Sequence, residues 1–282
     1  MKILRIISIL AIVSFLFSAC EKIDPPYKED GGGNGGDTTH VVQKVLIEDY
    51  TGHNCVNCPG AAVVAEQIKD LYGERVVVIA VHAGAFAMPT NDLPQDFRTE
   101  AGNEWNTYFN FNSAGYPNGM VNRTENAPGD YIISPTAWGT TTAGEMNKDA
   151  TIKMTVHSDF NQNTLNSQVS VEFLFPMDGK YNLLFCITQD SLVGPQKNND
   201  SNIGDTPLIE NYVFNHVLRY TNGVWGEQIS DKESFSIGDK FDLNYTVNFE
   251  TGWVPKHCHV VAFVFDQESK TIVQVEEGEV IE

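Results

Sequence analysis

The sequence has few basic residues: 18 Lys and Arg stand against 37 Asp and Glu in 282 residues, which gives a formal net charge of −19 at pH 7. It shows no basic stripe interleaved with aromatic residues, and an electrostatic field of this sign repels phosphate backbones. The composition therefore predicts that the protein has no nucleic-acid partner.

The chain also lacks the residue orders that mark several enzyme classes. No serine–histidine–acid order, phosphate-binding glycine loop or glycosidase-like pair of carboxylates stands out among the acidic residues. Apolar residues make up 41% of the chain and aromatic residues 11%, which is enough to build a core. The length suits two domains of ordinary size.

No apolar run is long enough to cross a bilayer. The longest, residues 6–17, follows two basic residues and precedes small residues and Cys20. A charged start, a short apolar run and small residues are typical of a signal peptide, which we expect over residues 1–19. Residues 16–20 (LFSAC) resemble a bacterial lipobox, which implies that Cys20 carries lipid. The alternative is ordinary cleavage that leaves Cys20 as a free thiol.

Residues 20–40 are rich in glycine, proline and acidic residues. Such a segment cannot bury apolar surface, so we expect a flexible tether. Its acidic tract is similar to the surface-export signals of some Gram-negative lipoproteins. The sequence thus predicts an outer-membrane lipoprotein that faces the periplasm or the cell surface, held to the membrane by the lipid on Cys20.

Cys55 and Cys58 form a Cys-x-x-Cys motif between the apolar run 45–47 and a predicted helix that starts near Pro59. Unpaired N–H groups in the first turn of a helix stabilise an anion, so a cysteine there ionises more readily than a free one. Two thiols at this spacing can close a disulfide and resolve a mixed one. The motif favours thiol–disulfide chemistry.

A second pair, Cys186 and Cys258, lies far from this motif and far apart in sequence. Disulfides persist in exported proteins, so the two cysteines could be bridged. Two separate buried thiols are the alternative, and the sequence does not choose between them.

Residues 41–149 alternate between strand and helix patterns. The apolar spacing and the positions of Pro59 and Gly73 predict a helix that ends before the glycine. A strand on each side of this helix implies a parallel pair joined by a crossover. The predicted strands are 45–50, 75–82 and 119–122, and the predicted helical segments are 58–72, 92–109 and 134–147.

Residues 150–282 change to a period of two, with turn residues between short apolar runs. This pattern predicts an antiparallel sandwich. The Asn- and Gly-rich stretch 193–228 is long for a connection, which favours a functional loop or a covering flap. The predicted strands are 151–156, 168–173, 181–189, 241–249, 259–265 and 271–276.

Several motifs together resemble a known family. They are residues 45–59 (VLIEDYTGHNCVNCP), 81–84 (VHAG), 115–123 (GYPNGMVNR), 216–219 (HVLR) and 260–264 (VVAFV). The first is similar to the strand, active-site loop and helix start of the thioredoxin superfamily, and the whole set resembles lipoproteins related to outer membrane protein 28. The resemblance implies an α/β thioredoxin-like domain over residues 41–149, followed by an all-β immunoglobulin-like sandwich over residues 150–282.

The resemblance also implies roles for single residues. Cys55 matches the attacking cysteine, at the more exposed end of the motif, and Cys58 the buried resolving one. Asp49 matches the buried acid that moves a proton off the resolving thiol, with Glu48 as the alternative if the register differs by one residue. Strand alternation puts these two acids on opposite faces, so only one can serve. Pro117 matches the cis-proline that faces the disulfide and pairs with a bound peptide.

One departure concerns the residues before the first cysteine, where thioredoxins usually have a tryptophan and this chain has His53 and Asn54. A protonated His53 would favour the Cys55 thiolate and could act as an acid or base. The alternative is a loop histidine that touches only solvent. A metal site built from both cysteines, His53 and His82 is a further alternative, but one Cys-x-x-Cys motif without a second pair is weak evidence for zinc.

The sequence therefore predicts thiol–disulfide exchange with exported protein or peptide partners, with the redox-active disulfide of Cys55 and Cys58 in place of any cofactor. The alternative is a non-enzymatic surface binding or adhesion lipoprotein in which the motif is a structural disulfide.

Overall fold

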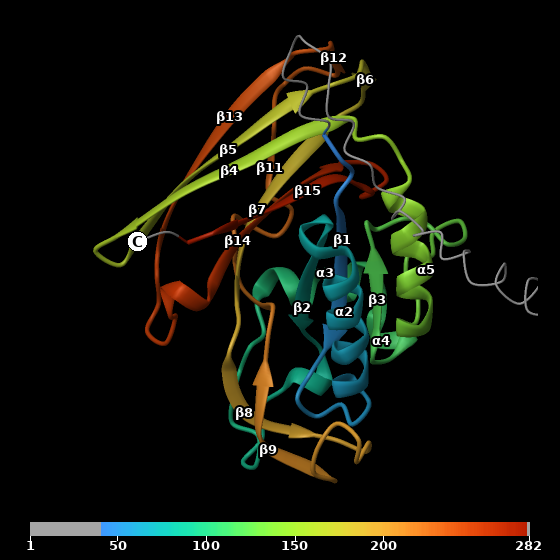
Figure 1. Ribbon diagram of the computed structural model, residues 1–282, viewed down its shortest axis with the longest axis vertical. Coiled ribbons are helices and arrows are strands. Elements are labelled where there is room, and N and C mark those ends of the chain that lie inside the picture. Colours follow the sequence, from blue (N-terminus) through green and yellow to red (C-terminus); the bar gives the residue numbers. More distant parts are fainter. Residues whose placement is uncertain (1–40, 281–282) are drawn as a thin grey trace, which may run out of the picture. The chain divides into compact units, whose positions relative to one another are not determined.

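The computed structural model describes residues 41–280, which contain the helices and strands drawn in Figure 1. The helices are α2 (Cys58–Tyr72), α3 (Glu100–Tyr108), α4 (Phe111–Ala114) and α5 (Pro135–Met146), with 3₁₀ turns η1 (Gly73–Arg75), η2 (Ala85–Ala87) and η3 (Pro255–His257). The strands are β1 (Val45–Thr51), β2 (Val76–His82), β3 (Asn118–Val121), β4 (Ile152–Asn161), β5 (Thr164–Phe173), β6 (Met177–Asp178), β7 (Tyr181–Gln189), β8 (Leu192–Lys197), β9 (Leu208–Phe214), β10 (Val217–Thr221), β11 (Glu227–Gln228), β12 (Ser234–Phe235), β13 (Lys240–Asn248), β14 (Cys258–Asp266) and β15 (Ile272–Glu279).

One eight-stranded sheet organises the chain. Its strand order is β15-β14-β7-β10-β2-β1-β3, and β11 pairs with β7 at the side. β1 and β2 are parallel, as the sequence predicts, while β3 runs antiparallel to β1. β10 joins the sheet beside β2 through the pair Val217–Ala80. The sheet thus takes strands from residues 41–149 and from residues 150–282, and the division into two domains at this boundary stays a prediction.

Helices cover both faces of the β2-β1-β3 part of the sheet. Ala61, Ala65 and Ile68 of α2 pack with Trp138 of α5 on one face, whereas α3 and α4 contribute to the apolar cluster on the other. α2 has the predicted bounds, because proline suits its first turn and Gly73 ends it at φ 58°. This helix fixes the position of the Cys-x-x-Cys motif.

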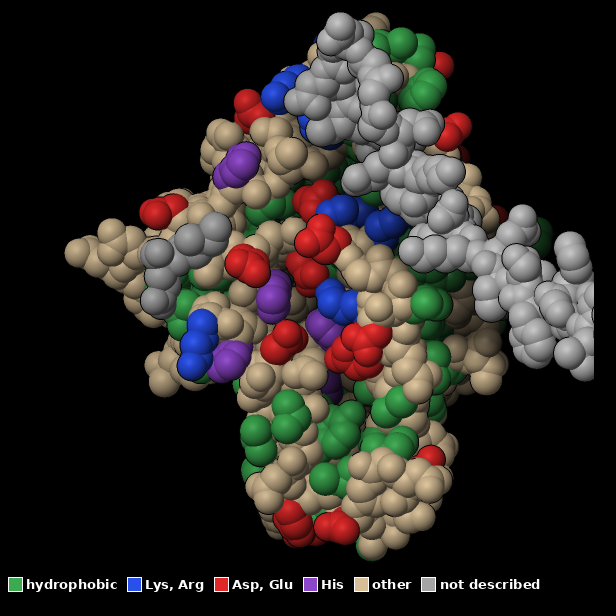
Figure 2. Space-filling view, in the orientation of Figure 1, with side chains coloured by type: hydrophobic (Ala, Val, Ile, Leu, Met, Phe, Trp, Pro, Cys, Tyr) green, Lys and Arg blue, Asp and Glu red, His purple; other side chains and the backbone are tan. Residues whose placement is uncertain are grey.

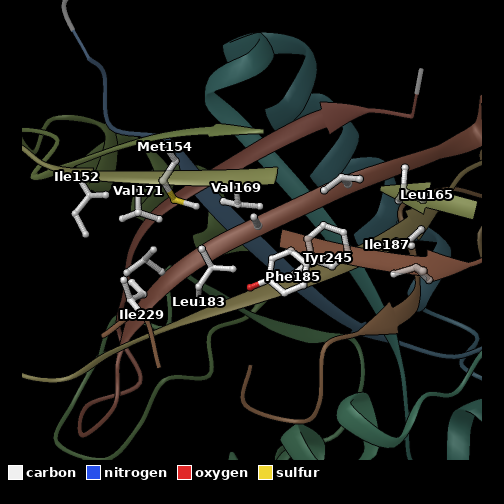
Figure 3. Packing of buried hydrophobic residues seen from close by; sticks show 14 of the residues in the cluster. Ile152, Met154, Leu165, Val169, Val171, Leu183, Phe185, Ile187, Ile229 and Tyr245 are labelled. Carbon is white, nitrogen blue, oxygen red and sulfur yellow. The ribbon is translucent and has the colours of Figure 1, made fainter. Parts of the chain in front are cut away.

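The second half of the described chain is rich in strands, as its period of two predicts. The three-stranded sheet β13-β5-β4 packs against β7 and β14 through a large apolar cluster, part of which is drawn in Figure 3. Phe185 of β7 stacks on Tyr245 of β13 with ring centroids 4.3 Å apart. The protein is therefore mostly β-sheet with several sheets, whereas the immunoglobulin-like assignment stays a prediction.

Three local predictions need correction. The segment 92–109 is helical only over α3, and the residues before this helix are irregular. Ser134 precedes α5, but its hydroxyl bonds to the Thr136 hydroxyl and does not cap the helix. The stretch 193–228 is not a single loop, because it contains most of β8 and all of β9, β10 and β11.

β8 and β9 form a hairpin with a two-stranded sheet of its own. The hairpin follows β7 and precedes β10, and the end of β7 pairs with the start of β10. The hairpin extends past the main sheet toward the start of α2 (Figure 1). This hairpin decides how accessible the motif is.

Cys186 and Cys258 are two separate buried thiols. They lie on the adjacent strands β7 and β14, but their side chains belong to different apolar clusters. The structure therefore favours the second of the two alternatives left open by the sequence. The predicted signal peptide over 1–19, the tether over 20–40 and lipid attachment at Cys20 lie outside the described residues.

Candidate redox site at the start of α2

Cys55 and Cys58 form a disulfide, and Cys58 is the first residue of α2. The predicted difference in exposure between the two cysteines is wrong, because each residue is only 2% exposed. Cys55 precedes the helix, as expected, but the β8–β9 hairpin covers it. The motif thus has the expected place in the fold and lacks the expected access to solvent.

The hairpin is attached to the motif by hydrogen bonds to its backbone. The N–H of Lys197 donates to the carbonyl of His53 at 3.0 Å, and the N–H of Asn199 donates to the carbonyl of Val56 at 3.2 Å. The Gln196 side chain donates from Nε2 to the carbonyl of Cys55 at 2.9 Å. These bonds confirm that the stretch after residue 193 contains a covering flap.

The loop before Cys55 is held from its other side by residues 86–88. The N–H of Asn54 donates to the carbonyl of Phe86 at 2.9 Å, and the Asn54 side chain donates to the carbonyl of Met88 at 2.9 Å. A Cβ atom on Gly52 would lie 2.4 Å from the backbone of Phe86, so only glycine allows this approach. The loop is fixed between two backbone segments.

Asp49 lies beneath the motif, on the sheet face that α2 covers. Val45 and Ile47 of the same strand pack on α2, and alternation along the strand puts Asp49 on their face. Asp49 is 2% exposed, its Oδ1 has no hydrogen-bond partner among residues 41–280, and burial raises its pKa to about 7. Asp49 is thus buried, as the resemblance implies, and its role in proton transfer stays a prediction.

Glu48 points to the opposite face, where it forms a buried ion pair with Arg123. The guanidinium donates to the two carboxylate oxygens at 2.8 and 2.7 Å, and both side chains are almost fully buried. Glu48 is therefore paired with Arg123 on the face opposite the disulfide. The alternative in which Glu48 takes the place of Asp49 through a one-residue shift in register is wrong.

His53 is fully buried, so the alternative of a histidine that touches only solvent is wrong. Its Nε2 lies 3.0 Å from the carbonyl oxygen of Met88. Burial lowers the pKa of His53 below its ordinary value, which favours the neutral imidazole at neutral pH. The predicted stabilisation of the Cys55 thiolate by a protonated His53 is thus disfavoured.

The peptide bond between Tyr116 and Pro117 is cis, as the resemblance implies. Pro117 directly precedes β3, whose residue Asn118 pairs with Tyr50 near the end of β1. The Tyr116 hydroxyl is 2.6 Å from Oδ1 of Asn106, which anchors the segment to α3. Pro117 therefore lies at the same end of the sheet as the Cys-x-x-Cys loop.

A small cavity of about 30 Å³ lies beside Cys58. Its walls include Thr51 at the end of β1, His82 at the end of β2 and Tyr212 of the hairpin. His82 is 2% exposed, and burial lowers its pKa to about 3. The cavity adds polar side chains next to the disulfide that the sequence did not assign to thiol chemistry.

Acidic and imidazole groups meet where the hairpin joins the main sheet. Nε2 of His216 is 3.1 Å from Oε1 of Glu66 on α2, and Nε2 of His259 is 3.3 Å from Oδ2 of Asp190. Asp190 also accepts a hydrogen bond from the N–H of His216 at 2.6 Å, which joins the segment before β8 to the segment after β9. Figure 2 shows histidine and charged side chains gathered near the middle of this face.

Within the described part of the chain, no three His, Cys, Asp or Glu side chains converge as metal ligands would. No helix in residues 41–280 has the length and apolar character needed to span a bilayer.

Sequence reasoning missed the contacts of Gln196, Lys197 and Asn199 with the motif, and also the ion pair of Arg123. The only signal for the first three was the unusual length of their segment. Arg123 follows a buried strand and has left-handed backbone at φ 48°, which no apolar pattern indicates. Both features depend on contacts between distant parts of the sequence.

Two solved structures share the overall fold at low sequence identity. HBP35 of Porphyromonas gingivalis is 16% identical, with 85% of this chain and 76% of that chain covered and a TM-score of 0.57. A structural-genomics protein from Agrobacterium tumefaciens is 10% identical, with 86% and 96% covered and a TM-score of 0.52. A domain of the outer membrane lipoprotein Omp28 from P. gingivalis is 20% identical over 46% of this chain and 88% of that chain, with a TM-score of 0.30.

No curated protein sequence matches the chain. The sequence profile described as outer membrane protein Omp28 matches residues 104–282, which is more than half of the chain. This match agrees with the motifs that the sequence shares with that family and places the protein at the outer membrane, as expected of an outer-membrane lipoprotein. The chain belongs to the Omp28 family of outer membrane proteins.

Proposed function

We propose that this protein is a lipid-anchored thiol–disulfide exchange protein that acts on exported protein partners. The observation that carries the proposal is Asp49: a carboxyl group 2% exposed, with no partner for Oδ1 among residues 41–280 and a pKa of about 7. It lies on the sheet face covered by α2, the helix that begins at Cys58. An unpaired buried acid lowers stability, and such groups are concentrated at reactive sites. A group that titrates near neutral pH can give and take protons from a thiol.

The proposed reaction starts from the disulfide and a dithiol partner. A partner thiolate attacks Cys55, the bond between the two cysteine sulfurs breaks, and Cys58 leaves as a thiolate that takes the proton of Asp49. The second thiolate of the same partner then attacks the partner's sulfur in the mixed disulfide. This step forms a disulfide within the partner and releases Cys55 as a thiolate. Two electrons pass from the partner to the protein, and the reverse sequence reduces a partner disulfide.

Access requires that the β8–β9 hairpin moves off the motif, because both sulfurs are covered. The hairpin is a two-stranded sheet, and its hydrogen bonds to the motif come from residues 196, 197 and 199. Val193 and Val213 on it are 61% and 50% exposed, so part of its apolar surface is unburied. Such elements open at a smaller free energy than a core strand does.

The finer assignments belong to the same proposal. We place a thioredoxin-like domain over 41–149 and an immunoglobulin-like sandwich over 150–282, with Pro117 facing the disulfide and pairing with a bound peptide. Lipid on Cys20 would hold the protein to the membrane, and residues 20–40 would give it reach. Exported proteins or peptides with exposed cysteines are the proposed partners.

The second candidate is a non-enzymatic surface binding protein whose disulfide is structural. The burial of both sulfurs at 2% exposure favours it. A structural disulfide in an exported protein has a potential below about −300 mV and resists reduction.

Reduction of insulin and repair of a scrambled disulfide protein test the two candidates. Exchange predicts turnover by the wild type, loss in Cys55→Ser, and accumulation of a mixed disulfide with the partner in Cys58→Ser. Equal and negligible rates in all three proteins, together with a potential below about −300 mV, would establish the structural disulfide instead.

A further inference from the structure

His82 is a buried imidazole to which the proposed exchange mechanism gives no role. Its ring lies edge-on to Phe97 at 5.2 Å and to Phe214 at 5.6 Å. Neither ring nitrogen has a hydrogen-bond partner of acceptable geometry among the described residues. An imidazole carries at least one N–H donor, and an unpaired buried donor costs about 1–3 kcal/mol. Buried waters typically bond to polar groups that are otherwise unsatisfied.

The cavity between His82 and Cys58 suits one water. Its volume of about 30 Å³ exceeds the roughly 10–15 Å³ that a cavity needs to hold one water. Thr51, Gln196 and Asn215 also line it, so polar groups are available on several sides. A buried water needs 2–4 such partners.

The two free thiols show what burial does to a cysteine in this fold. Burial raises the pKa of Cys258 to about 11 and that of Cys186 still further above the ordinary range. Cys58 is as inaccessible as Cys258, each at 2% exposure. The Cys58 thiol shares this burial once the disulfide is reduced, so its ionisation depends on the start of α2 and on polar neighbours that favour the thiolate.

We propose that His82 holds an ordered water against the sulfur of Cys58, and that this water stabilises the Cys58 thiolate. The inference rests on the proposed exchange function, in which that thiolate is a reactant. Cys58 gives its proton to Asp49, attacks Cys55 in the mixed disulfide, and releases the partner as a thiolate. The water donates a hydrogen bond to the sulfur while it is negatively charged, and its second bond is to the neutral imidazole.

His82 is a positioning residue in this scheme, since it reaches the sulfur only through the water. Its pKa of about 3 keeps the ring neutral across the working pH range, so it does not take up the proton itself. A neutral ring also avoids placing a cation beside the disulfide within an apolar environment.

The test compares His82→Phe with His82→Gln in a full-length Cys55→Ser background, where Cys58 is the only thiol of the motif. The ¹³Cβ shift of Cys58, followed by NMR against pH, reports its pKa. Phenylalanine keeps the ring contacts but cannot bind water, and we expect it to raise the pKa by about one unit, which is a tenfold loss of thiolate. Glutamine keeps a donor and an acceptor and should stay within ~0.3 unit of the parent.

A long-lived water should also give a nuclear Overhauser effect to His82 in the parent, and this signal should be lost in the phenylalanine variant. Thr51→Val alters a different wall of the cavity and should raise the pKa in the same direction, which keeps the test valid if His82→Phe does not fold. Equal Cys58 pKa values in the parent and both folded variants would overturn the inference. Lack of exchange activity in the wild type would instead remove the proposed function and leave this titration as a separate result.

Discussion

Glu48 and Asp49 are adjacent in sequence, equally buried, and opposite in what surrounds them. Glu48 is 1% exposed and has a bidentate guanidinium partner, whereas Asp49 is 2% exposed and has a carboxylate oxygen with no hydrogen-bond partner in residues 41–280. Side chains alternate along β1, so Glu48 points toward α3 and Asp49 toward α2. One strand thus carries a structural acid and a candidate reactive acid in consecutive positions.

The comparison shows that burial alone does not identify a reactive group. Arg123 lies within 6 Å of several aromatic rings, among them those of Trp105 and Phe263 at 5.1 and 5.2 Å. Burial opposes its charge, but the carboxylate of Glu48 more than offsets this and raises its pKa. For Asp49 no charged partner among the described residues compensates the burial, and its pKa rises. The presence or absence of a paired charge separates the two sites.

The largest expected effect comes from breaking the structural pair. Arg123→Ala leaves a carboxylate buried without its partner, and we expect the free energy of unfolding to fall by about 3–5 kcal/mol. Urea unfolding at pH 7 measures this loss. Lys148→Ala is the control, since it removes an exposed partner of Glu145 and should cost less than about 1 kcal/mol. A loss no greater than that of the control would show that the Glu48 pair is not structural.

Asp49→Asn should change stability in the opposite direction. The pKa of Asp49 is raised from 3.8 to about 7 in the fold, so the folded protein binds the proton more tightly and loses stability as the pH rises between these values. At about 1.4 kcal/mol per pKa unit, the variant should gain up to about 4 kcal/mol at pH 8 and almost nothing at pH 4. Urea unfolding at both pH values measures the gain.

The matched control for this prediction is Glu48→Gln, which makes the same chemical change one residue earlier and should destabilise the protein. Equal gains for Asp49→Asn at pH 4 and pH 8 would contradict a raised pKa for Asp49.

A smaller, pH-dependent effect is expected where the hairpin joins the main sheet, at the contact of His259 with Asp190. The hydrogen bond to Asp190 raises the pKa of His259. Burial opposes the ionisation of Asp190, but hydrogen bonds from His259 and His216 outweigh it and lower the pKa of Asp190 to about 2. The stabilisation from His259 is present below about pH 6.5 and is lost as the pH rises through its raised pKa. That from Asp190 is present above about pH 4 and is lost as the pH falls toward 2.

Reduction of the buried disulfide by a phosphine reductant should therefore be faster at pH 8 than at pH 6, because the hairpin is held less firmly. The ratio of the two rates should be smaller in His259→Gln than in the wild type. An identical ratio in both proteins would show that this contact does not hold the hairpin.

The smallest effect is expected from removing one hydrogen bond between the β8–β9 hairpin and the motif. Gln196→Ala removes the side-chain bond to the carbonyl of Cys55, which is worth about 1 kcal/mol, or roughly fivefold in the open population. Phosphine reduction at pH 7 should be faster by about that factor, with global stability almost unchanged. Gln228→Ala, on exposed β11 away from the motif, is the control. No difference between the two variants would mean that Gln196 does not contribute to closure.

Much of the fold near the motif could be predicted from the sequence, because its signals are local. The apolar spacing from Ala61 to Ile68, together with Pro59 and Gly73, determines the bounds of α2. The buried strand β2 is a nearly continuous apolar run rich in β-branched residues, and its limits follow from composition. The disulfide and the buried acid follow from the resemblance around residues 45–59.

The remainder could not be predicted because it depends on pairing between distant segments. β10 enters the main sheet through the single pair Val217–Ala80, and no sequence pattern indicates which strand it joins. The cover over Cys55 is formed by residues more than a hundred positions later, through backbone bonds that carry little residue preference. The Arg123 pair likewise depends on a rigid arrangement of several elements.

Proton transfer by Asp49 is tested most directly by the pH dependence of exchange between the Cys55–Cys58 disulfide and a protein dithiol, measured in the wild type and in Asp49→Asn. We expect a wild-type rate profile with an inflection near pH 7 that disappears in the variant, where the rate falls by about a hundredfold. A wild-type rate no higher than that of Cys55→Ser at every pH would contradict this expectation.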